Sequence, residues 1–446
     1  MIHDYDEAVA YLEHLVATPV CNEPGAGLAR ARLMLAHVGD PQERFATLHV
    51  TGSSGKGSTA AMAAAILRAA GYRTGIFSSP HLEAYTERIA VDGAPIAPSD
   101  WTRLLNRLHP FVEQMAGGAL SGYTLGRPAL LQVLWPMAAL YFAERGVEVA
   151  VVEVGMGGRY DSTNANNARV AVVTNVSLEH TQHLGATVAE IAYHKAGVAK
   201  PSGIVITAAQ DPAARAPIAA ECARQGATLW RATPEGDGEV RFTDDEAGLC
   251  IATPARTHGG LRLGLRGRHQ HANAACAVAA VDALEALGIV RVAGDAVSRG
   301  LAAAYVPGRL EQVADDPVTL LDGAHNPDAA RALAAALRDL FPGQPLVLLL
   351  GILADKDVAA MVEALAPLAR AVVVTEPPWE GRMGQAHTVA HAAERYLPDV
   401  IVVPAVGAAF TAAQQRARDL GGPLVVAGSL ILVGAVRALV HGQTSR

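Results

Sequence analysis

The sequence predicts an α/β protein built from two domains, and three observations support this fold class. An apolar segment at 45–50 leads through a glycine-rich turn into an alanine-rich helical segment, and similar patterns recur along the chain. A second alternation of strands and helices begins after Pro307-Gly308. The length of 446 residues is also large for one core. We expect residues 1–304 to form an N-terminal domain with a P-loop-type, mostly parallel sheet and flanking helices, and residues 305–446 to form a smaller, Rossmann-like α/β domain.

Strands and helices of the N-terminal domain are separated by glycine and proline. The apolar periodicity predicts helices at 4–15, 28–37, 59–70, 129–145, 188–198 and 270–287. Apolar runs predict strands at 45–50, 74–78, 148–154 and 169–175. Between residues 198 and 304 the pattern is less clear, and we expect further strand–turn–helix units there. Open parallel sheets bind ligands at the carboxyl ends of their strands, so residues that follow these strands are candidate site residues.

The turn after the first strand has a pattern typical of phosphate binding. It reads Gly52-Ser53-Ser54-Gly55-Lys56-Gly57-Ser58. Backbone N–H groups in such a turn face an anion, a lysine adds positive charge, and a hydroxyl can reach Mg²⁺. The match to the standard P-loop is imperfect, because Gly57 separates Lys56 from Ser58 and the first glycine comes late. On this pattern alone, an ordinary turn between strand and helix is the alternative.

Composition indicates the cellular compartment and the kinds of partner that the protein binds. A net charge of −7 argues against nucleic acid or an anionic membrane as the main partner. The mean hydropathy is +0.21, yet apolar runs such as 345–353 are far shorter than the ~20 residues that span a bilayer. Segment 1–7 is acidic with no long apolar stretch behind it, and the four cysteines lack metal or disulfide spacing. We expect a cytoplasmic protein that binds neither membrane nor nucleic acid.

Polar side chains occur at the ends of several predicted strands. His81 follows the strand at 74–78, Glu153 ends an apolar strand, and His180 lies shortly after the strand at 169–175. The hydroxyl of Ser58, a carboxylate and an imidazole beside a phosphate loop can hold Mg²⁺, which borrows further oxygens from phosphate. For Glu153 the alternative is a surface ion pair, which its apolar strand disfavours. For His180 it is a structural role, because the chain has 16 histidines.

Lys195 lies in a largely apolar predicted helix, beside Ala192 and Ala196. Burial lowers the pKa of a lysine, and the neutral amine can react with CO₂ to form a carbamate, which resembles a carboxylate and can bind a metal. The alternative is a lysine that extends along the surface to solvent.

The second domain repeats the alternation of strands and helices. We predict strands at 319–321, 346–350, 371–375, 400–403 and 424–426, and helices at 327–340, 357–365, 388–396 and 408–420. After its first strand comes Leu321-Asp322-Gly323-Ala324-His325-Asn326-Pro327. Asn326 can cap the next helix, with Pro327 at its first position. Capping does not explain Asp322 and His325, and we expect both to protrude at the crevice of this sheet.

Taken together, these segments resemble the folylpolyglutamate synthase and dihydrofolate synthase family of the Mur ligase superfamily. Gly52–Ser58 stands where the family has G-T-N-G-K-G-S, and the block from Glu153 through Gly155-Met156-Gly157-Gly158-Arg159 to Asn164 resembles its most specific segment. Further similar segments follow in the same order along nearly the whole chain: Ser79-Pro80-His81-Leu82, Glu179-His180-Thr181, Lys195-Ala196-Gly197, Gly267-Arg268-His269-Gln270, Pro307-Gly308-Arg309, Asp322–Pro327 and Gly428-Ser429-Leu430.

The resemblance implies an ATP-dependent ligase that joins L-glutamate to a folate, either dihydropteroate or a folyl-glutamate. In this family the acceptor carboxylate attacks the γ-phosphate to give an acyl phosphate and ADP, and the amine of glutamate then displaces phosphate. Phosphoryl transfer builds negative charge on oxygens, so a phosphate loop and divalent cations suit it. The resemblance also implies ATP, two Mg²⁺ sites with K⁺ as a further candidate cation, and a monomer that binds only small molecules.

Matching positions give the expected site residues. For the nucleotide they are Ser54, Gly55, Lys56, Gly57, Asn273, Arg309 and Asp322. For metal they are Ser58, Glu153, His180 and carbamylated Lys195. For the acceptor and the incoming glutamate they are His81, Gln132, Tyr160, Asp161, Ser162, His325 and Ser429. Among all these, the expected catalytic residues are Lys56, Lys195 and His325.

Departures from the family pattern concentrate where the acceptor should bind. The Gly25-Ala26-Gly27 loop lacks an acidic residue, Gln132 stands where a glutamate is common, and His194 replaces the glutamate before Lys195. Two alternatives therefore accompany folate ligation: a glutamate ligase for a non-folate carboxylic acid, and a nucleotide-binding protein without catalysis. The retained Lys195 argues against the second, because binding alone does not need a carbamate.

Overall fold

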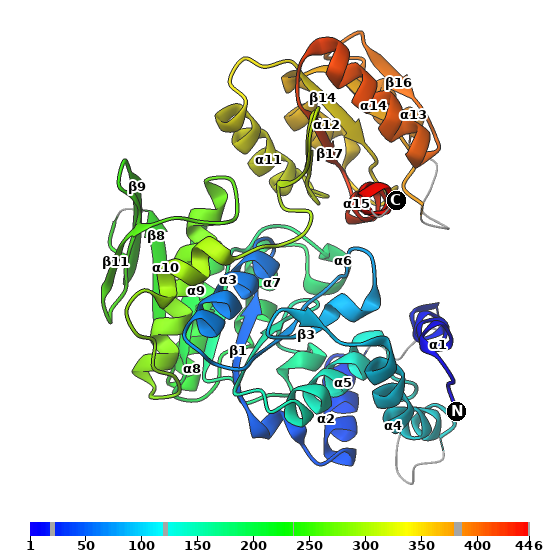
Figure 1. Ribbon diagram of the computed structural model, residues 1–446. Coiled ribbons are helices and arrows are strands. Elements are labelled where there is room, and N and C mark those ends of the chain that lie inside the picture. Colours follow the sequence, from blue (N-terminus) through cyan, green and yellow to red (C-terminus); the bar gives the residue numbers. More distant parts are fainter. Residues whose placement is uncertain (18–22, 119–123, 235, 379–385, 445–446) are drawn as a thin grey trace. The chain divides into compact units, whose positions relative to one another are not determined.

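Figure 1 shows a computed structural model of the protein, which describes residues 1–17, 23–118, 124–234, 236–378 and 386–444. The chain divides into two compact units. The first contains Met1–Gly264 and Gln270–Tyr305, and the second contains Leu265–His269 and Val306–Arg446. The division after Tyr305 lies beside the domain boundary expected from the sequence, which stays a prediction. The sequence did not indicate that the short stretch Leu265–His269 belongs with the second unit.

The first unit contains a mixed sheet with a parallel centre, in the order β11-β10-β9-β8-β7-β6-β1-β5-β2-β3-β4. Neighbouring strands from β2 to β9 run parallel, and the pairs at both ends of the sheet are antiparallel. The strands are β1 (Ala46–Thr51), β2 (Thr74–Phe77), β3 (Ile89–Val91), β4 (Ala94–Pro95), β5 (Val149–Glu153), β6 (Val170–Val173), β7 (Ile204–Thr207), β8 (Thr228–Pro234), β9 (Val240–Asp245), β10 (Gly248–Ala252) and β11 (Thr257–Leu261).

Helices surround this sheet, some of them packed on its faces and others on neighbouring helices (Figure 1). They are α1 (Tyr5–Ala17), α2 (Ala26–His37), α3 (Lys56–Ala69), α4 (Pro98–Ala116), α5 (Leu130–Glu144), α6 (Thr181–Leu184), α7 (Val188–Ala196), α8 (Pro212–Gln225), α9 (His269–Ala286) and α10 (Ala296–Ala303). Every residue of β5 is buried, as expected of a central parallel strand that is covered on both faces. Within the described residues, the model contains no helix with the length and apolar character needed to cross a membrane.

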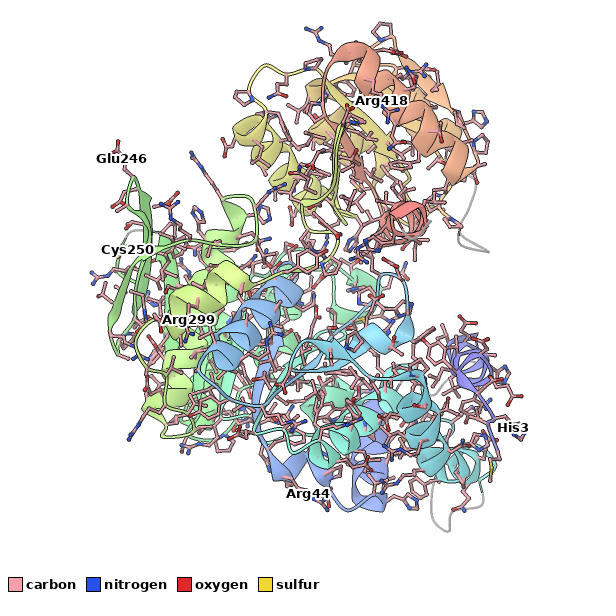
Figure 2. All side chains as sticks on the ribbon, in the orientation of Figure 1. His3, Arg44, Glu246, Cys250, Arg299 and Arg418 are labelled. Carbon is pink, nitrogen blue, oxygen red and sulfur yellow. The ribbon has the colours of Figure 1, made fainter. Side chains whose placement is uncertain are left out.

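Helices α3 and α10 approach each other closely at a glycine. A Cβ atom on Gly300 would lie only 2.4 Å from the Cα of Ile66, so a larger residue there would separate the two helices. Near the same contact, Nη2 of Arg299, labelled on α10 in Figure 2, donates a hydrogen bond to the carbonyl of Ala69 at 3.0 Å. This packing supports the helix that begins at the phosphate loop.

The expected strand–turn–helix repeat continues through β7, α8 and β8 and then proves wrong. Strands β9, β10 and β11 instead form antiparallel hairpins, and Glu246 lies at the turn between β9 and β10 (Figure 2). In β10 buried residues alternate with partly exposed ones, and most residues of β9 are exposed, as in strands with one solvated face.

A buried carboxylate ties this hairpin region to α9. Asp282 is fully buried, and its oxygens accept hydrogen bonds from Arg256 at 2.8 Å and from Thr253 at 2.7 Å, while Nε2 of His258 lies 3.0 Å away. Burial acts to raise the pKa of Asp282, but its hydrogen bonds with His258, Thr253 and Arg256 and the neighbouring charges outweigh this, so the pKa is lowered. The stabilisation is therefore present above the ordinary carboxyl pKa and is lost as the pH falls through the folded-state value.

Replacing Asp282 with alanine is expected to lower the free energy of unfolding by about 2–3 kcal/mol, because it leaves Arg256 without its buried partner. This expected loss in the free energy of unfolding is small for a buried ion pair because the side chain of Arg256 is 35% exposed and can be hydrated. Urea denaturation measures the change. The control Asp295→Ala removes an ion pair with Arg299 whose side chains are 71% and 60% exposed, and is expected to cost less than about 1 kcal/mol. Equal losses in both variants would contradict the anchoring role.

The second unit has a smaller sheet in the order β12-β13-β17-β14-β15-β16, parallel except for β12. Its strands are β12 (Glu311–Asp315), β13 (Val318–Leu321), β14 (Leu346–Leu350), β15 (Ala369–Val374), β16 (Val400–Val402) and β17 (Leu424–Ala427). Its helices are α11 (Pro327–Leu340), α12 (Val358–Leu365), α13 (Ala386–Ala393), α14 (Val406–Leu420) and α15 (Leu430–Thr444). With its two α/β units, the protein has the predicted fold class.

Candidate active site

The candidate site of the first unit lies where the central parallel strands end. In the sheet, β6, β1, β5 and β2 are neighbours, so the segments that follow them meet at one edge. These segments are the phosphate loop after β1, the end of β5 at Glu153, residues 174–180 after β6 and residues 78–82 after β2. The parallel register places Val50 opposite Glu153. Four stretches far apart in the sequence are thus brought together by strand order.

Two glycines give the phosphate loop its shape. Gly52 has φ 147°, and a Cβ there would lie 1.7 Å from Oγ1 of Thr174. Gly55 has φ 84°, and its Cβ would lie 2.2 Å from Oδ1 of Asn273. Both positions therefore exclude a side chain. Helix α3 begins at Lys56, three residues before the predicted start, so Lys56, Gly57 and Ser58 form its first turn, whose N–H groups can bind an anion.

Contacts around the loop place three predicted nucleotide residues. Nζ of Lys56 donates to the carbonyls of Gly52 at 2.8 Å and Ser53 at 3.3 Å, which keeps its positive charge at the loop. The N–H of Ser54 donates to Oδ1 of Asn175 at 2.7 Å, so here this N–H holds the loop to β6. The side chain of Asn273 lies against Gly55 and donates to Gln270 at 2.8 Å. The structure thus brings Asn273 beside the loop, and its contact with a nucleotide stays a prediction.

Glu153 lies beside the first turn of α3. Its side chain is 4% exposed, and its carboxylate oxygens would lie 3.8 and 3.9 Å from a Cβ on Gly57. Oε2 accepts a hydrogen bond from the N–H of Ser79 at 3.1 Å. The predicted metal residue Ser58, next to Gly57, is 3% exposed. A surface ion pair for Glu153 is excluded by this burial.

Lys195 is buried and paired with an acid to which the sequence interpretation gave no role. Its side chain is 1% exposed, and Nζ donates to Oε1 of Glu179 at 2.6 Å. Burial lowers the pKa of Lys195 to about 8; the charge of Glu179 acts to raise it, and Lys56 acts to lower it. Burial also acts to raise the pKa of Glu179, but the charges of Lys195 and Lys56 outweigh it, so that pKa is lowered. The predicted burial of Lys195 is confirmed.

The donor set at this edge suits a hard divalent cation. Ser58 and Glu153 offer oxygens, which Mg²⁺ prefers, and His180 offers a nitrogen. His180 is exposed, has a left-handed φ of 46° and caps the short helix α6. In the described ranges, no three His, Cys, Asp or Glu side chains form a ready-made metal group.

The predicted acceptor residues of α5 and its neighbours lie close together. Oε1 of Gln132 accepts from the N–H of Ala129 at 2.9 Å and from Nη1 of Arg30, which is fully buried, at 3.2 Å. Its Nε2 would lie 2.7 Å from a Cβ on Gly27, so that glycine makes room for the amide. Tyr160 is 39% exposed and lies beside Gly25.

Two histidines near this region are held by neighbours. Nε of Arg88 donates to Nδ1 of His81 at 2.8 Å. Burial, then the charge of Arg88, lowers the pKa of His81 to about 4, so the imidazole is neutral at physiological pH. His194 packs edge-on against Tyr160, with ring centroids 5.7 Å apart, and burial lowers its pKa too.

Two further predicted substrate residues, Asp161 and Ser162, make hydrogen bonds to neighbouring residues of the chain. Asp161 accepts hydrogen bonds from the N–H of Met156 at 3.0 Å, and from the N–H and Oγ1 of Thr163 at 2.9 and 2.6 Å. Burial raises its pKa. Oγ of Ser162 donates to the carbonyl of Leu131 at 3.3 Å. Both carboxylate oxygens of Asp161 thus accept hydrogen bonds within the turn after Glu153, and its contact with a substrate stays a prediction.

In the second unit the structure corrects one expectation. Asp322 does not protrude: it is 7% exposed, and its oxygens accept from the N–H groups of Leu310 at 3.0 Å and Ala324 at 2.9 Å. Burial raises its pKa, which the charge of Arg309 partly offsets. Nη1 of Arg309 lies against Gly323, 2.6 Å from where a Cβ would be. Asp322 therefore holds the turn beside Arg309.

The remaining predicted residues of this unit lie at the starts of helices. Asn326 caps α11, because its Oδ1 accepts from the N–H of Ala329 at 2.8 Å, and the predicted cap is confirmed. His325, just before it, is partly exposed, and its Nδ1 lies 2.8 Å from the carbonyl of Gly323. Ser429 is 1% exposed and caps the start of α15 by accepting from the N–H of Leu432 at 3.1 Å. Ser429 thus has a local structural role.

Comparison with known protein families identifies the class of enzyme. Residues 131–281 match the Mur ligase middle domain, and residues 308–430 match the Mur ligase glutamate ligase domain. A phosphate loop followed by a second α/β unit agrees with these matches. The chain is a Mur-type ligase, an enzyme class that forms carbon–nitrogen bonds.

Similar proteins over nearly the full length give the family. A dihydrofolate synthase/folylpolyglutamate synthase of Mycobacterium tuberculosis is 35% identical over 92% of this chain and 89% of its own length. Escherichia coli FolC in complex with DHPP and ADP has a TM-score of 0.85 and 29% identity, covering 99% of both chains. A bifunctional folylpolyglutamate synthase/dihydrofolate synthase of Yersinia pestis complexed with AMPPNP and a Mn ion has a TM-score of 0.83 and 29% identity, covering 98% of both chains. The chain belongs to the folylpolyglutamate synthase/dihydrofolate synthase family.

Proposed function

We propose that this protein joins L-glutamate to a folate-type carboxylic acid with ATP as the phosphoryl donor, and that it works as a single chain in the cytoplasm. The observation that carries the proposal is the convergence at one sheet edge of the phosphate loop, buried Glu153 and the ion pair of buried Lys195 with Glu179. Family membership supports the same reaction. A nucleotide-binding protein without catalysis would have no use for a buried, paired lysine at this position.

The first half of the reaction is phosphoryl transfer. The acceptor carboxylate attacks the γ-phosphorus, the bond to the β-phosphate oxygen breaks, and ADP leaves. In our proposal the N–H groups at the start of α3 and the ammonium of Lys56 orient the phosphates. Ser58, Glu153 and His180 would hold Mg²⁺, which neutralises charge on phosphate oxygens when bound. Ser54 and Asn273 contribute by fixing the shape of the loop.

The second half forms the amide. The neutral amine of glutamate attacks the carbonyl carbon of the acyl phosphate, phosphate leaves with its bridging oxygen, and the nitrogen loses a proton. We propose that Arg309 contacts the nucleotide and that His325, partly exposed just before α11, contacts the incoming glutamate. Asp322 and Ser429 support these residues by holding their turns.

Lys195 is proposed to act as a carbamate. Its burial and its pKa of about 8 support a neutral fraction of Nζ that can react with CO₂. Addition of the lone pair of the neutral amine to the carbon of CO₂, with loss of one proton from nitrogen, gives a carbamate anion. The anion would hold a second cation near the phosphates.

The acceptor is proposed to lie along Gln132, Tyr160 and His81. A non-folate carboxylic acid is the second candidate, and one observation favours it: Gln132 places a neutral amide beside Gly27 where a carboxylate is common in the family. A folate remains the main proposal because relatives over the full length bear folate names.

Acceptor-dependent ADP release tests this proposal. We expect ADP to form only when glutamate and a pteroyl acceptor are both present, with dihydropteroate and tetrahydrofolate compared in parallel against a panel of other carboxylic acids. Glutamate with no acceptor is the matched blank. If ATP turnover with each acceptor equals turnover in the blank, ligase function is rejected. Turnover with a non-folate acid and with no pteroyl acceptor would establish the second candidate.

A further inference from the structure

The strand that enters the phosphate loop also holds the turn that follows Glu153. His49 and Thr51 alternate along β1, so their side chains lie on the same face of the sheet. Oγ1 of Thr51 donates to the carbonyl of Gly157 at 2.6 Å, and Nε2 of His49 lies 2.9 Å from Oγ1 of Thr163. Both side chains on β1 are fully buried. The turn at 155–163 is thus attached at two points to the strand that carries the loop.

The hydrogen-bond pattern fixes the proton on His49. Oγ1 of Thr163 lies 2.6 Å from Oδ1 of Asp161 and donates its one proton there. It must therefore accept from His49, which carries its proton on Nε2. Nδ1 of His49 has no hydrogen-bond partner among the described residues. Burial, then the charge of Lys200, lowers the pKa of His49 to about 3, so the ring is neutral.

The same chain of hydrogen bonds continues to the residues just after Glu153. Oδ2 of Asp161 accepts from the N–H of Met156 at 3.0 Å. His49 donates to Thr163, Thr163 donates to Asp161, and Asp161 holds Met156. The four groups form a relay from β1 to the segment that leaves β5. Because Met156 follows Glu153 by three residues, the relay limits movement of that end of β5.

We propose that His49 is a positioning residue for the ligase reaction, which acts through Thr163 and Asp161 to hold the 155–163 turn, and with it Glu153, against the phosphate loop. The consequence for catalysis rests on the proposed function, whereas the relay itself does not. Displacement of a reacting group by about 1 Å can cost up to ~100-fold in rate. We expect the loss of the relay to lower kcat and to raise the Mg²⁺ requirement.

Kinetic variants test the relay. His49→Leu removes the donor, and we expect kcat at saturating ATP, glutamate and acceptor to fall roughly tenfold, with a higher Mg²⁺ concentration at half-maximal rate and an unchanged KM for glutamate. His49→Gln keeps an N–H near the position of Nε2 and should restore most of kcat. Thr163→Val should match His49→Leu, and the double variant should be no worse than either, because one relay is broken in all three. Unchanged kcat in a folded His49→Leu protein, or losses that multiply in the double variant, would overturn the proposal.

A second readout does not depend on activity. ¹⁵N NMR of the unmodified protein labelled at histidine reports which ring nitrogen carries the proton. We expect one buried imidazole, absent from His49→Gln, to stay neutral and protonated on Nε2 from pH 5 to pH 8. A proton on Nδ1, or titration near the ordinary pKa of histidine, would refute the relay even if the ligase activity is confirmed. If the relay is found and no ligation is detected, the proposed function fails by itself.

Discussion

Replacing Lys195 with alanine is expected to reduce amide formation by roughly 10³-fold, the loss typical of removing a preorganised charged group from an active site. The substitution removes the amine that would form the carbamate and leaves partly exposed Glu179 without its partner 2.6 Å away. If the carbamate is what matters, short carboxylates such as formate or acetate can occupy the space and restore part of the rate. Amide product and ADP are measured together with increasing added carboxylate.

Lys200 provides a matched control for this experiment. It is also a lysine whose pKa burial lowers to about 8, but its Nζ donates to the carbonyl of Asn164 at 3.0 Å and does not contact Glu179. Lys200→Met should show no response to added carboxylate. Full activity of Lys195→Ala without carboxylate, or the same rescue in both variants, would remove the carbamate from the mechanism.

Replacing Glu153 with glutamine is expected to raise the Mg²⁺ concentration needed for half-maximal activity by at least about tenfold. Glutamine keeps an oxygen that can accept from the N–H of Ser79, so the local fold should survive. It lacks the negative charge that a hard cation prefers in its ligands. An Mg²⁺ titration of ADP release at saturating substrates measures the shift.

Glu148→Gln is the control for the Glu153 variant. Glu148 is exposed, lies next to the opposite end of β5, and accepts a hydrogen bond from the N–H of Arg73 at 2.9 Å. Its substitution should leave the Mg²⁺ titration unchanged. Superimposable titration curves for Glu153→Gln and the unmodified protein would rule out Glu153 as a cation ligand.

The features predicted from sequence are those encoded by short patterns. The glycine-rich turn, the apolar strands on either side of it and the cap at Asn326 each depend on neighbours within a few residues. Parallel strand order then brings Glu153 and the segment containing His180 to the phosphate loop without any knowledge of side-chain contacts. The long helix α4 was not predicted; Pro110 inside it interrupts the usual helical pattern.

The features that were missed depend on contacts between distant residues. Glu179 precedes Lys195 by 16 residues, and only the fold of α6 and α7 shows that the two form an ion pair. The relay from His49 to Thr163 spans 114 residues. Asp322 was expected to protrude at the crevice because helix capping did not explain it, yet two backbone N–H groups hold it inside. An acid next to a predicted metal residue, as Glu179 is to His180, was the available signal.

Oxygen transfer during turnover tests most directly whether the chain ligates glutamate through an acyl phosphate. The acceptor is labelled with ¹⁸O in both oxygens of its carboxylate, and the amide product and the phosphate are analysed by mass spectrometry from the same reaction. The account predicts one ¹⁸O atom in each phosphate released, with the other retained in the amide. Amide formation with unlabelled phosphate would contradict attack of the acceptor carboxylate on the γ-phosphorus.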